Sequence, residues 1–237
     1  LTVGGVTADL PDGWLDQCEA FLKQFEPVID ELHAILTSNA IFIRRTAGVG
    51  VLSPEVAVDY GCSGPVLRGS GVKWDLRKPR PYMGYEQYDF DVPTATEGDT
   101  YARYLVRVQE FRESLKIVEQ ALNKLPMGPV RSDNRKFVTP PRSEIGVSME
   151  ALIHHFKLWT EGFPAPKASV YSAIESPRGE LGVYLEGDGG PKPYRVHWRT
   201  PSFENLTVVP KLVKGHLVAD LVAILASTDI VLGDIDR

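Results

Sequence analysis

Two long stretches of the chain carry apolar residues at the three- and four-residue spacing of an amphipathic helix. They cover residues 14–36 and residues 101–125. Asp99 precedes the second stretch as an N-cap, Asp12 is the equivalent candidate for the first, and Pro27 is expected to kink the first helix. Because the two apolar stripes match, we predict that these helices pack side by side as part of a bundle.

Shorter helices are predicted where a capping residue and a helix-ending residue bracket a segment. Ser53 followed by Pro54 begins one such helix, and Gly61 ends it. Ser148 caps another, which carries SMEALIHHFKLWTE and ends at Gly162.

The pattern changes from helical to alternating in the last third of the chain. VYSAIES, ELGVYLE and YRVHWRT each alternate between apolar and polar residues, and GDGG separates the second from the third. This predicts three antiparallel strands, over residues 170–176, 180–186 and 194–200. A further helical segment is expected to end near Ser227.

These elements predict an α+β fold that is mainly helical, with long packed helices and a small antiparallel sheet. We expect three parts along the chain. Residues 1–125 form part of a helical bundle with an irregular, Arg-rich insertion at 46–97, and residues 126–147 form a linker. Residues 148–237 hold a helix, the three-stranded sheet and a C-terminal helix and tail.

Composition narrows the possible partners. The 237 residues are 43% hydrophobic and 24% charged, which is ordinary for a soluble globular protein, and the net charge is −5. A mildly negative chain is not suited to bind nucleic acid or an anionic membrane directly. No apolar run reaches the roughly 18 residues that a membrane helix needs, so we expect no transmembrane segment.

The two cysteines and the first residue add two expectations. Cys18 and Cys62 stand alone, so we expect reduced thiols and no zinc or iron–sulfur site on them. The adjacent His154 and His155 point about 100° apart on a helix and cannot easily share a metal. The chain begins with Leu1 instead of Met, and we expect a processed or truncated chain.

The segment GPVLRGSGVKWDLRKPRPY is an Arg-rich excursion without the strand and helix that flank a phosphate-binding loop. Its backbone N–H groups, with Arg68 and Arg77, could cradle an anion. The favoured alternative is an ordered loop whose arginines pair with acids of the same or a neighbouring chain.

Pro177-Arg178-Gly179 separates the first two predicted strands, where a plain hairpin would prefer Asn-Gly. Proline fixes one backbone angle and glycine permits close approach, so the turn would aim Arg178 in a defined direction. Alternatively, Arg178 only caps nearby carbonyl groups. No Ser-His-Asp, Cys-His or paired-carboxylate arrangement can be assigned from spacing.

Several motifs together resemble the D subunit of the proton-pumping NADH:quinone oxidoreductase, respiratory complex I. They span essentially the whole chain and include LRGSGVKWDLRKPRPY, SMEALIHHFKLWTEGF, ESPRGELGVYLEGDGG, KPYRVHWRTPSF and GHLVADLVAILASTDIVLGDIDR. This subunit is similar in fold to the large subunit of nickel–iron hydrogenases, which binds its metals through two Cys pairs. The matching C-terminal segment here, residues 229–234, has no cysteine, so the resemblance implies that the metal centre is lost.

The resemblance implies a quinone cavity between this chain and the partner subunit that carries the terminal 4Fe–4S cluster. Electrons from NADH, which binds elsewhere in the complex, would pass from that cluster to quinone, coupled to proton translocation by membrane subunits. The family's quinone-binding Tyr and His would lie upstream of Leu1. Further expected partners are the C subunit and the quinone-channel subunit of the membrane arm, with the protein peripheral on the cytoplasmic side of the inner membrane.

By position, the resemblance assigns Val231 and Leu232 to the cavity wall, with Gly233 allowing close approach. The Pro177-Arg178-Gly179 turn resembles a hydrogenase segment whose arginine overhangs the active-site cavity. The terminal residues Asp236 and Arg237 are expected to anchor the chain end at the subunit interface. No catalytic residue, metal or resident cofactor is expected on this chain.

Two alternatives stay open. One is the large subunit of a membrane-bound nickel–iron hydrogenase, which the missing Cys ligands disfavour. The other is a protein-interaction scaffold with no quinone role. Such a scaffold would use the Arg-rich excursion and the strand face formed by Arg195, His197 and Arg199.

Overall fold

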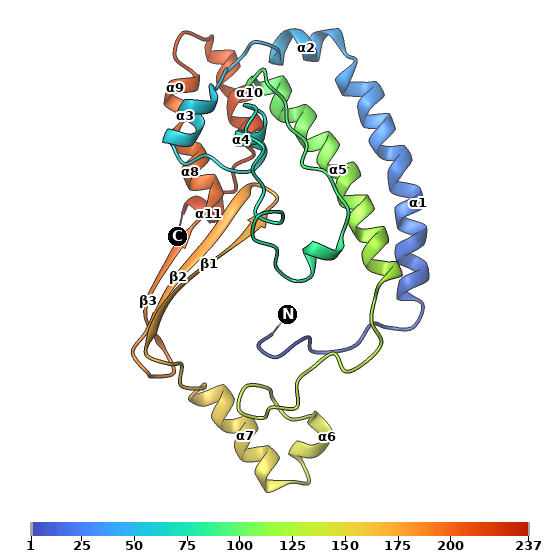
Figure 1. Ribbon diagram of the computed structural model, residues 1–237, viewed down its shortest axis with the longest axis vertical. Helices are drawn as coiled ribbons and strands as arrows, with labels where there is room; N and C mark the ends of the chain where they lie inside the picture. The colour runs from blue at the N-terminus through green and yellow to red at the C-terminus, as the bar shows by residue number, and fades with distance from the viewer. Residues whose placement is uncertain (1, 237) are drawn as a thin grey trace. The chain divides into compact units, whose positions relative to one another are not determined.

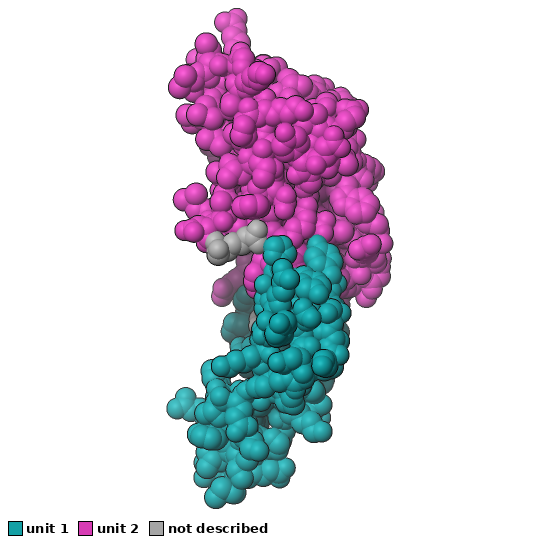
Figure 2. Space-filling model, turned by 90° about the vertical axis from the view of Figure 1, so that its left-hand side faces the viewer, with its two compact units in different colours: residues 1–15, 125–171, 184–197 teal, residues 16–124, 172–183, 198–237 magenta. Residues whose placement is uncertain are grey.

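Helices and a three-stranded antiparallel sheet make up the computed structural model of this chain, which describes residues 2–236 (Figure 1). The described residues form two compact units, each assembled from separate segments (Figure 2). Unit 1 comprises the chain up to Leu15, Leu125–Tyr171 and Tyr184–His197. Unit 2 comprises Asp16–Lys124, Ser172–Val183 and the chain from Trp198 onward. The predicted α+β class, mainly helical with a small antiparallel sheet, is confirmed.

The two long predicted helices are present and lie side by side in unit 2 (Figure 1). Helix α1 spans Trp14–Leu32, runs past Pro27 and is followed by a π-helical turn at His33–Thr37, while α5 spans Thr100–Asn123. Their contacts include an edge-to-face pair of Phe25 and Phe111, with ring centroids 6.5 Å apart. Since α1 begins at Trp14, directly after Gly13, the predicted N-cap at Asp12 is wrong.

Asp99 caps α5 as predicted. Its carboxylate accepts hydrogen bonds from the Ala102 N–H and from the Gly48 N–H, both at 2.7 Å, and the residue is 6% exposed. One side chain therefore starts α5 and also fixes the chain that follows α2, Ala40–Thr46.

The predicted insertion at residues 46–97 is irregular apart from three short helical segments. These are α3 at Pro54–Asp59, capped by Ser53 as predicted, α4 at Pro65–Arg68 and a 3-10 turn at Tyr85–Gln87. Cation–π contacts stabilise the later part of the insertion, with Lys78 Nζ 3.9 Å from the centroid of the Phe90 ring.

The core of unit 2 lies where the insertion meets the C-terminal helices. Those helices are α8 at Pro201–Thr207, α9 at Val209–Leu212, α10 at Val218–Thr228 and α11 at Leu232–Ile235. The buried apolar residues of this core are Leu52, Ala57, Cys62, Val66, Leu67, Val208, Leu212 and Ile224. No described helix is long and apolar enough to cross a membrane.

The sheet has the order β1-β2-β3, with strands at Ala168–Ser176, Gly179–Gly187 and Pro193–Arg199. Within unit 1, α6 spans Arg142–Ile145 and α7 spans Met149–Thr160, and the Ser148 hydroxyl caps α7 as predicted.

We expect Asp99→Ala to lower the free energy of unfolding by about 2 kcal/mol, because one buried carboxylate satisfies two backbone N–H groups. Ser53→Ala removes an exposed cap whose hydroxyl lies 3.4 Å from the Val56 nitrogen, and should cost less than about 1 kcal/mol. Urea unfolding of the purified variants measures both, and equal losses would contradict the double role of Asp99.

Candidate functional site

Arg68 is the centre of a buried charge network in unit 2. Its side chain is 2% exposed and extends from the end of α4. The guanidinium contacts Glu110 of α5, with its Nε 2.8 Å and its Nη2 2.7 Å from Oε1, and Glu175 of β1, with Nη1 2.8 Å from Oε1. Nη1 also donates to the Trp74 carbonyl at 2.9 Å. Arg68 therefore joins the excursion, the long helix and the sheet.

A second ion pair extends the network along the excursion. The Arg77 guanidinium binds both carboxylate oxygens of Asp75, with Nη2 2.6 Å from Oδ2, and Asp75 Oδ2 lies 3.9 Å from Arg68 Nη1. Glu175 Oε2 accepts from the Leu76 N–H at 3.2 Å. Both predicted arginines are thus paired with acids of this chain, as the favoured interpretation stated. Their contact with another chain stays a prediction.

Burial and ion pairing shift the pKa values of the carboxyl groups in this network in opposite directions. Burial raises the pKa of Glu110 and of Glu175, and the nearby Arg68 only partly offsets it. Burial also acts to raise the pKa of Asp75, but the hydrogen bonds to Arg77 and the charges of Arg77 and Arg68 together outweigh burial, and the net shift is downward. The two glutamates are therefore the acids of the network that most readily take up a proton.

The Pro177-Arg178-Gly179 turn is fixed by a backbone contact with the Ser63-Gly64 turn. The Ser63 hydroxyl accepts from the Glu180 N–H at 3.0 Å. A Cβ on Gly64, whose φ is +66°, would lie 2.4 Å from the Arg178 carbonyl oxygen. The close approach that the sequence predicted for this turn is therefore present, on Gly64 as well as on Gly179.

Asn205 of α8 clamps the two turns together. Its side chain is fully buried, its Nδ2 donates to the Arg178 carbonyl at 3.3 Å, and its Oδ1 accepts from the Ser63 N–H at 3.2 Å. The main chain at Arg178 is thereby fixed, so its side chain leaves the turn in a defined direction.

That side chain meets a second charged cluster, formed by Arg107, Arg178 and Asp229. Arg178 Nε lies 3.2 Å and Arg107 Nε lies 4.0 Å from Asp229 Oδ2. Asp229 follows α10 with a left-handed backbone, φ 51° and ψ 52°. Arg178 thus pairs with an acid, and the side chain of Asp229 remains 40% exposed.

The predicted wall residues begin two positions after Asp229, at Val231. Val231 is half-buried and its N–H donates to the Ser202 hydroxyl at 3.2 Å, while Leu232 is 75% exposed and Gly233 is exposed. The short helix α11 is held within unit 2 by Asp234, whose carboxylate accepts from the Ser202 hydroxyl at 3.0 Å.

The terminal anchor at a subunit interface stays a prediction. Asp236 is exposed, and Arg237 lies outside the described residues. Sequence analysis did not single out Asp234 as the residue that holds this segment.

The other candidate residues lie apart from the network. Cys62 is a buried free thiol, and burial raises its pKa to about 11, so little of the reactive thiolate forms at neutral pH. Within residues 2–236, no group of three or more His, Cys, Asp or Glu side chains is arranged to hold a metal.

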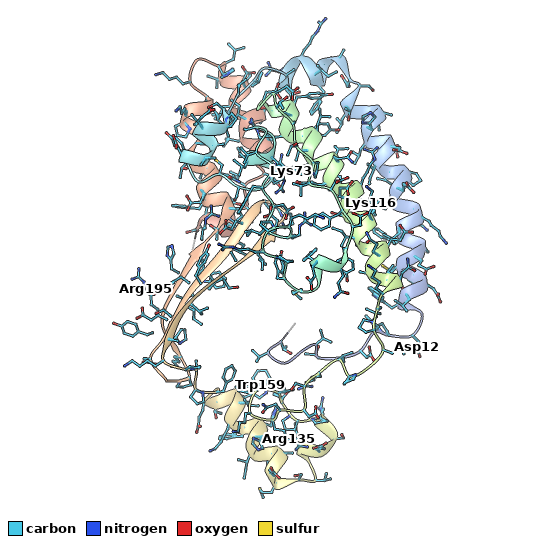
Figure 3. All side chains as sticks on the ribbon, in the orientation of Figure 1. Asp12, Lys73, Lys116, Arg135, Trp159 and Arg195 are labelled. Carbon is cyan, nitrogen blue, oxygen red and sulfur yellow. The ribbon has the colours of Figure 1, made fainter. Side chains whose placement is uncertain are left out.

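The predicted strand face on β3 is only partly free. Arg195, labelled in Figure 3, is exposed, whereas Arg199 donates to the carbonyls of Glu180 and Gly61 at 2.8 Å.

Sequence reasoning missed Glu110, Glu175, Arg107 and Asn205. Arg103, Arg107 and Glu110 occupy one face of α5 at spacings of four and three residues, next to apolar positions. Charged residues that repeat with the helical period beside apolar positions could have indicated a buried charged face on this helix. Some of their side-chain partners lie far away in sequence, 42 residues for Glu110 with Arg68 and 124 residues for Arg103 with Ser227, so no spacing rule could identify them.

Fold and site define a helix-rich α+β protein whose candidate site is built from arginines and carboxylates in place of thiolate metal ligands. Comparison with protein families matches residues 1–237 to the family described as respiratory-chain NADH dehydrogenase, 49 Kd subunit. The chain belongs to this family, which confirms the resemblance seen in its motifs.

Individual relatives carry matching names, each being a D subunit of an NADH-quinone oxidoreductase. The chain is 56% identical to such a protein of Roseiflexus sp. (strain RS-1), over 99% of this chain and 57% of that protein. It is 50% identical to those of Ehrlichia chaffeensis and Geobacter sulfurreducens, over 99% of this chain and 60% of each relative. The chain therefore spans about three-fifths of the length of these relatives.

We expect Gly64→Ala to destabilise the fold by about 3 kcal/mol or more, because the added Cβ would collide with the Arg178 carbonyl oxygen. Gly48→Ala is the control: its φ is +71° but its Cβ would meet nothing within 4 Å, so about 1–2 kcal/mol is expected. Thermal unfolding of both variants measures the difference. Equal losses would show that the turn-to-turn contact does not stabilise the fold.

Arg68→Met should cost about 3–5 kcal/mol at pH 7, because it leaves buried carboxylates without their cation. The pKa values of Glu110 and Glu175 already lie above the ordinary 4.5 and would rise further. Because these pKa values are higher in the folded protein than in the unfolded chain, protonation of the two glutamates stabilises the folded state. This contribution is complete below pH 4.5 and is lost as the pH rises through the folded pKa values. The cost of the substitution should therefore shrink from pH 8 to pH 5.

Urea unfolding at several pH values checks this expectation. Arg112→Met is the matched control on α5, since Arg112 pairs with Asp30 at 3.0 Å on the surface and should contribute about 1 kcal/mol or less. A cost for Arg68→Met that does not change between pH 8 and pH 5 would contradict the account of the network.

Proposed function

We propose that this chain is the part of the complex I D subunit that forms one wall of the quinone cavity, next to the partner subunit with the terminal 4Fe–4S cluster. The observation that carries the proposal is the Arg178–Asp229 pair in unit 2, because Asp229 lies two residues before the segment of half-buried Val231 and exposed Leu232 and Gly233. Membership of the 49 Kd family and the names of the relatives support it.

The segment suits an apolar ligand with a polar ring. Val231 and Leu232 offer branched apolar side chains, and a Cβ on Gly233 would meet nothing within 4 Å, so the backbone there is open to close approach. A quinone buries mostly carbon and presents two carbonyl oxygens, which guanidinium N–H groups can recognise. Arg178 would orient the ring while the apolar wall excludes water.

In this proposal the chain has no catalysis of its own and binds no cofactor. Electrons from NADH, oxidised elsewhere in the complex, would reach quinone as the substrate through the 4Fe–4S cluster of the partner. Contacts with the C subunit and the quinone-channel subunit would place the chain peripherally, on the cytoplasmic side of the inner membrane. A hydrogenase role is disfavoured because the segment from Asp229 to Asp234 has no thiolate.

Val231→Trp in the full-length subunit of the assembled complex should raise the KM for quinone by about tenfold and change inhibitor sensitivity, because the added ring would fill the wall of the cavity. Val222→Trp is the control, since Val222 of α10 is 70% exposed and lies outside the proposed wall. Steady-state quinone reduction measures both. An unchanged KM together with unchanged inhibition in Val231→Trp would remove Val231 from the cavity wall.

A further inference from the structure

We propose that Arg107 is a headgroup-facing residue of the quinone site, and that Arg107 and Arg178 together make this site prefer a ring oxygen that carries negative charge. The inference rests on the proposed function and deepens it. Nothing in the family resemblance or in the sequence pattern assigned a role to Arg107.

The first observation is that the Arg107 guanidinium is only partly satisfied. Its Nη1 donates to the Arg103 carbonyl at 3.1 Å, one turn back on α5. Its Nη2 is buried and has neither a hydrogen bond nor an ion pair among the described residues, while its Nε and Nε of Arg178 are buried and face Asp229 without forming a hydrogen bond. Unpaired buried donors are costly, so an acceptor that reached this position would be bound favourably.

The second observation is a local surplus of positive charge. The cluster contains two guanidinium groups, Arg107 and Arg178, and one carboxylate, Asp229. Of the other charged groups that face Arg107, Glu110 is bound by Arg68, and Arg68 is itself a cation. As far as residues 2–236 show, this cluster therefore carries a net positive charge.

Arg103, one turn before Arg107 on the same face of α5, is a further cation beside the cluster. It is fully buried, and its guanidinium donates to the carbonyls of Gly50 and Gly98 and to the hydroxyls of Ser227 and Thr100. Within the described part of the chain no carboxylate binds Arg103 through a hydrogen bond, although Asp99 lies near enough to act on its charge, so Arg103 adds positive charge to this face of α5.

The third observation is access. Arg178 and Asp229 keep 35% and 40% of their side chains exposed, and Arg107 keeps 20%. Asp229 lies two residues before Val231 of the proposed wall. The cluster is thus partly open on unit 2 and borders the segment that would contact the ring.

These observations define the ligand chemistry. Electron uptake by a neutral quinone puts negative charge on its ring oxygens, and two electrons with two protons give the neutral quinol. The electrons come from the iron–sulfur cluster of the partner subunit in the proposed function. Charge-assisted hydrogen bonds from guanidinium groups are stronger than those to a neutral carbonyl, so Arg107 and Arg178 would favour the charged oxygen.

A pair of probes tests this preference in the assembled complex. 2-Hydroxy-1,4-naphthoquinone is anionic at neutral pH, and its 2-methoxy analogue is neutral but similar in shape. Calorimetric titration of the unaltered complex should give an affinity about tenfold or more higher for the anion, the size of one charge-assisted hydrogen bond. Equal affinities for the two probes would overturn the inference without any substitution.

Arg107→Gln should weaken the anionic probe by about tenfold and the neutral probe by less than about threefold. Arg107→Lys retains the charge and should recover most of the preference. Arg112→Gln, on the surface of the same helix, should change neither affinity. Equal weakening of both probes would indicate a structural role for Arg107 and overturn the inference, as would no change in either.

The outcome also separates the two levels of the proposal. If Val231→Trp alters quinone binding while Arg107→Gln leaves the preference for the anion intact, the wall stands and the role of Arg107 fails. If neither probe binds the complex in competition with quinone and Val231→Trp has no effect, the proposed function fails as well.

Discussion

The structure of unit 2 depends on one buried cation. Arg68 ends a four-residue helix that could not be stable by itself, and its guanidinium connects three elements that are distant in the sequence. Removing an arginine from water costs several kcal/mol, so this residue is acceptable only because Glu110, Glu175 and a backbone carbonyl bind it directly. The position of Glu175 then matters beyond its charge, because it lies three residues before Arg178. The contact that neutralises Arg68 also fixes the strand that leads into the turn.

The charges are distributed unevenly between two neighbouring clusters. Around Arg68 and Arg77 there are three carboxylates for two guanidinium groups, and around Asp229 there is one carboxylate for two guanidinium groups. Together the eight groups are neutral, so burying them does not leave a net charge in the protein. Their separation still creates a local field, negative near the excursion and positive near the segment before Val231. A network that is neutral as a whole can therefore be locally positive at Arg107 and Arg178.

The sequence predicted elements well and contacts poorly, for a physical reason. The stripes of α1 and α5, the caps Asp99 and Ser148 and the three strands are local features, and each is present. The short helices α8 and α9 were not separated from the helical segment that follows them. The network was out of reach because its ion pairs join residues such as Arg68 and Glu175, which are 107 positions apart. The anchoring role of Asp234 depends in the same way on Ser202, 32 residues earlier.

The turn at Arg178 shows why local reasoning reached the right residue and left its role open. Proline and glycine indicated a defined direction for the side chain, but the sequence left open whether Arg178 only caps nearby carbonyl groups. The direction is decided by Asn205, a fully buried amide that holds the Arg178 carbonyl, and by Gly64, where only a hydrogen fits against that carbonyl. With its main chain fixed in this way, Arg178 extends to Asp229 instead of capping a carbonyl of its own turn. A rigid backbone behind a partly exposed guanidinium is the arrangement that recognition of a ligand oxygen requires, because little conformational entropy is lost when the ligand binds.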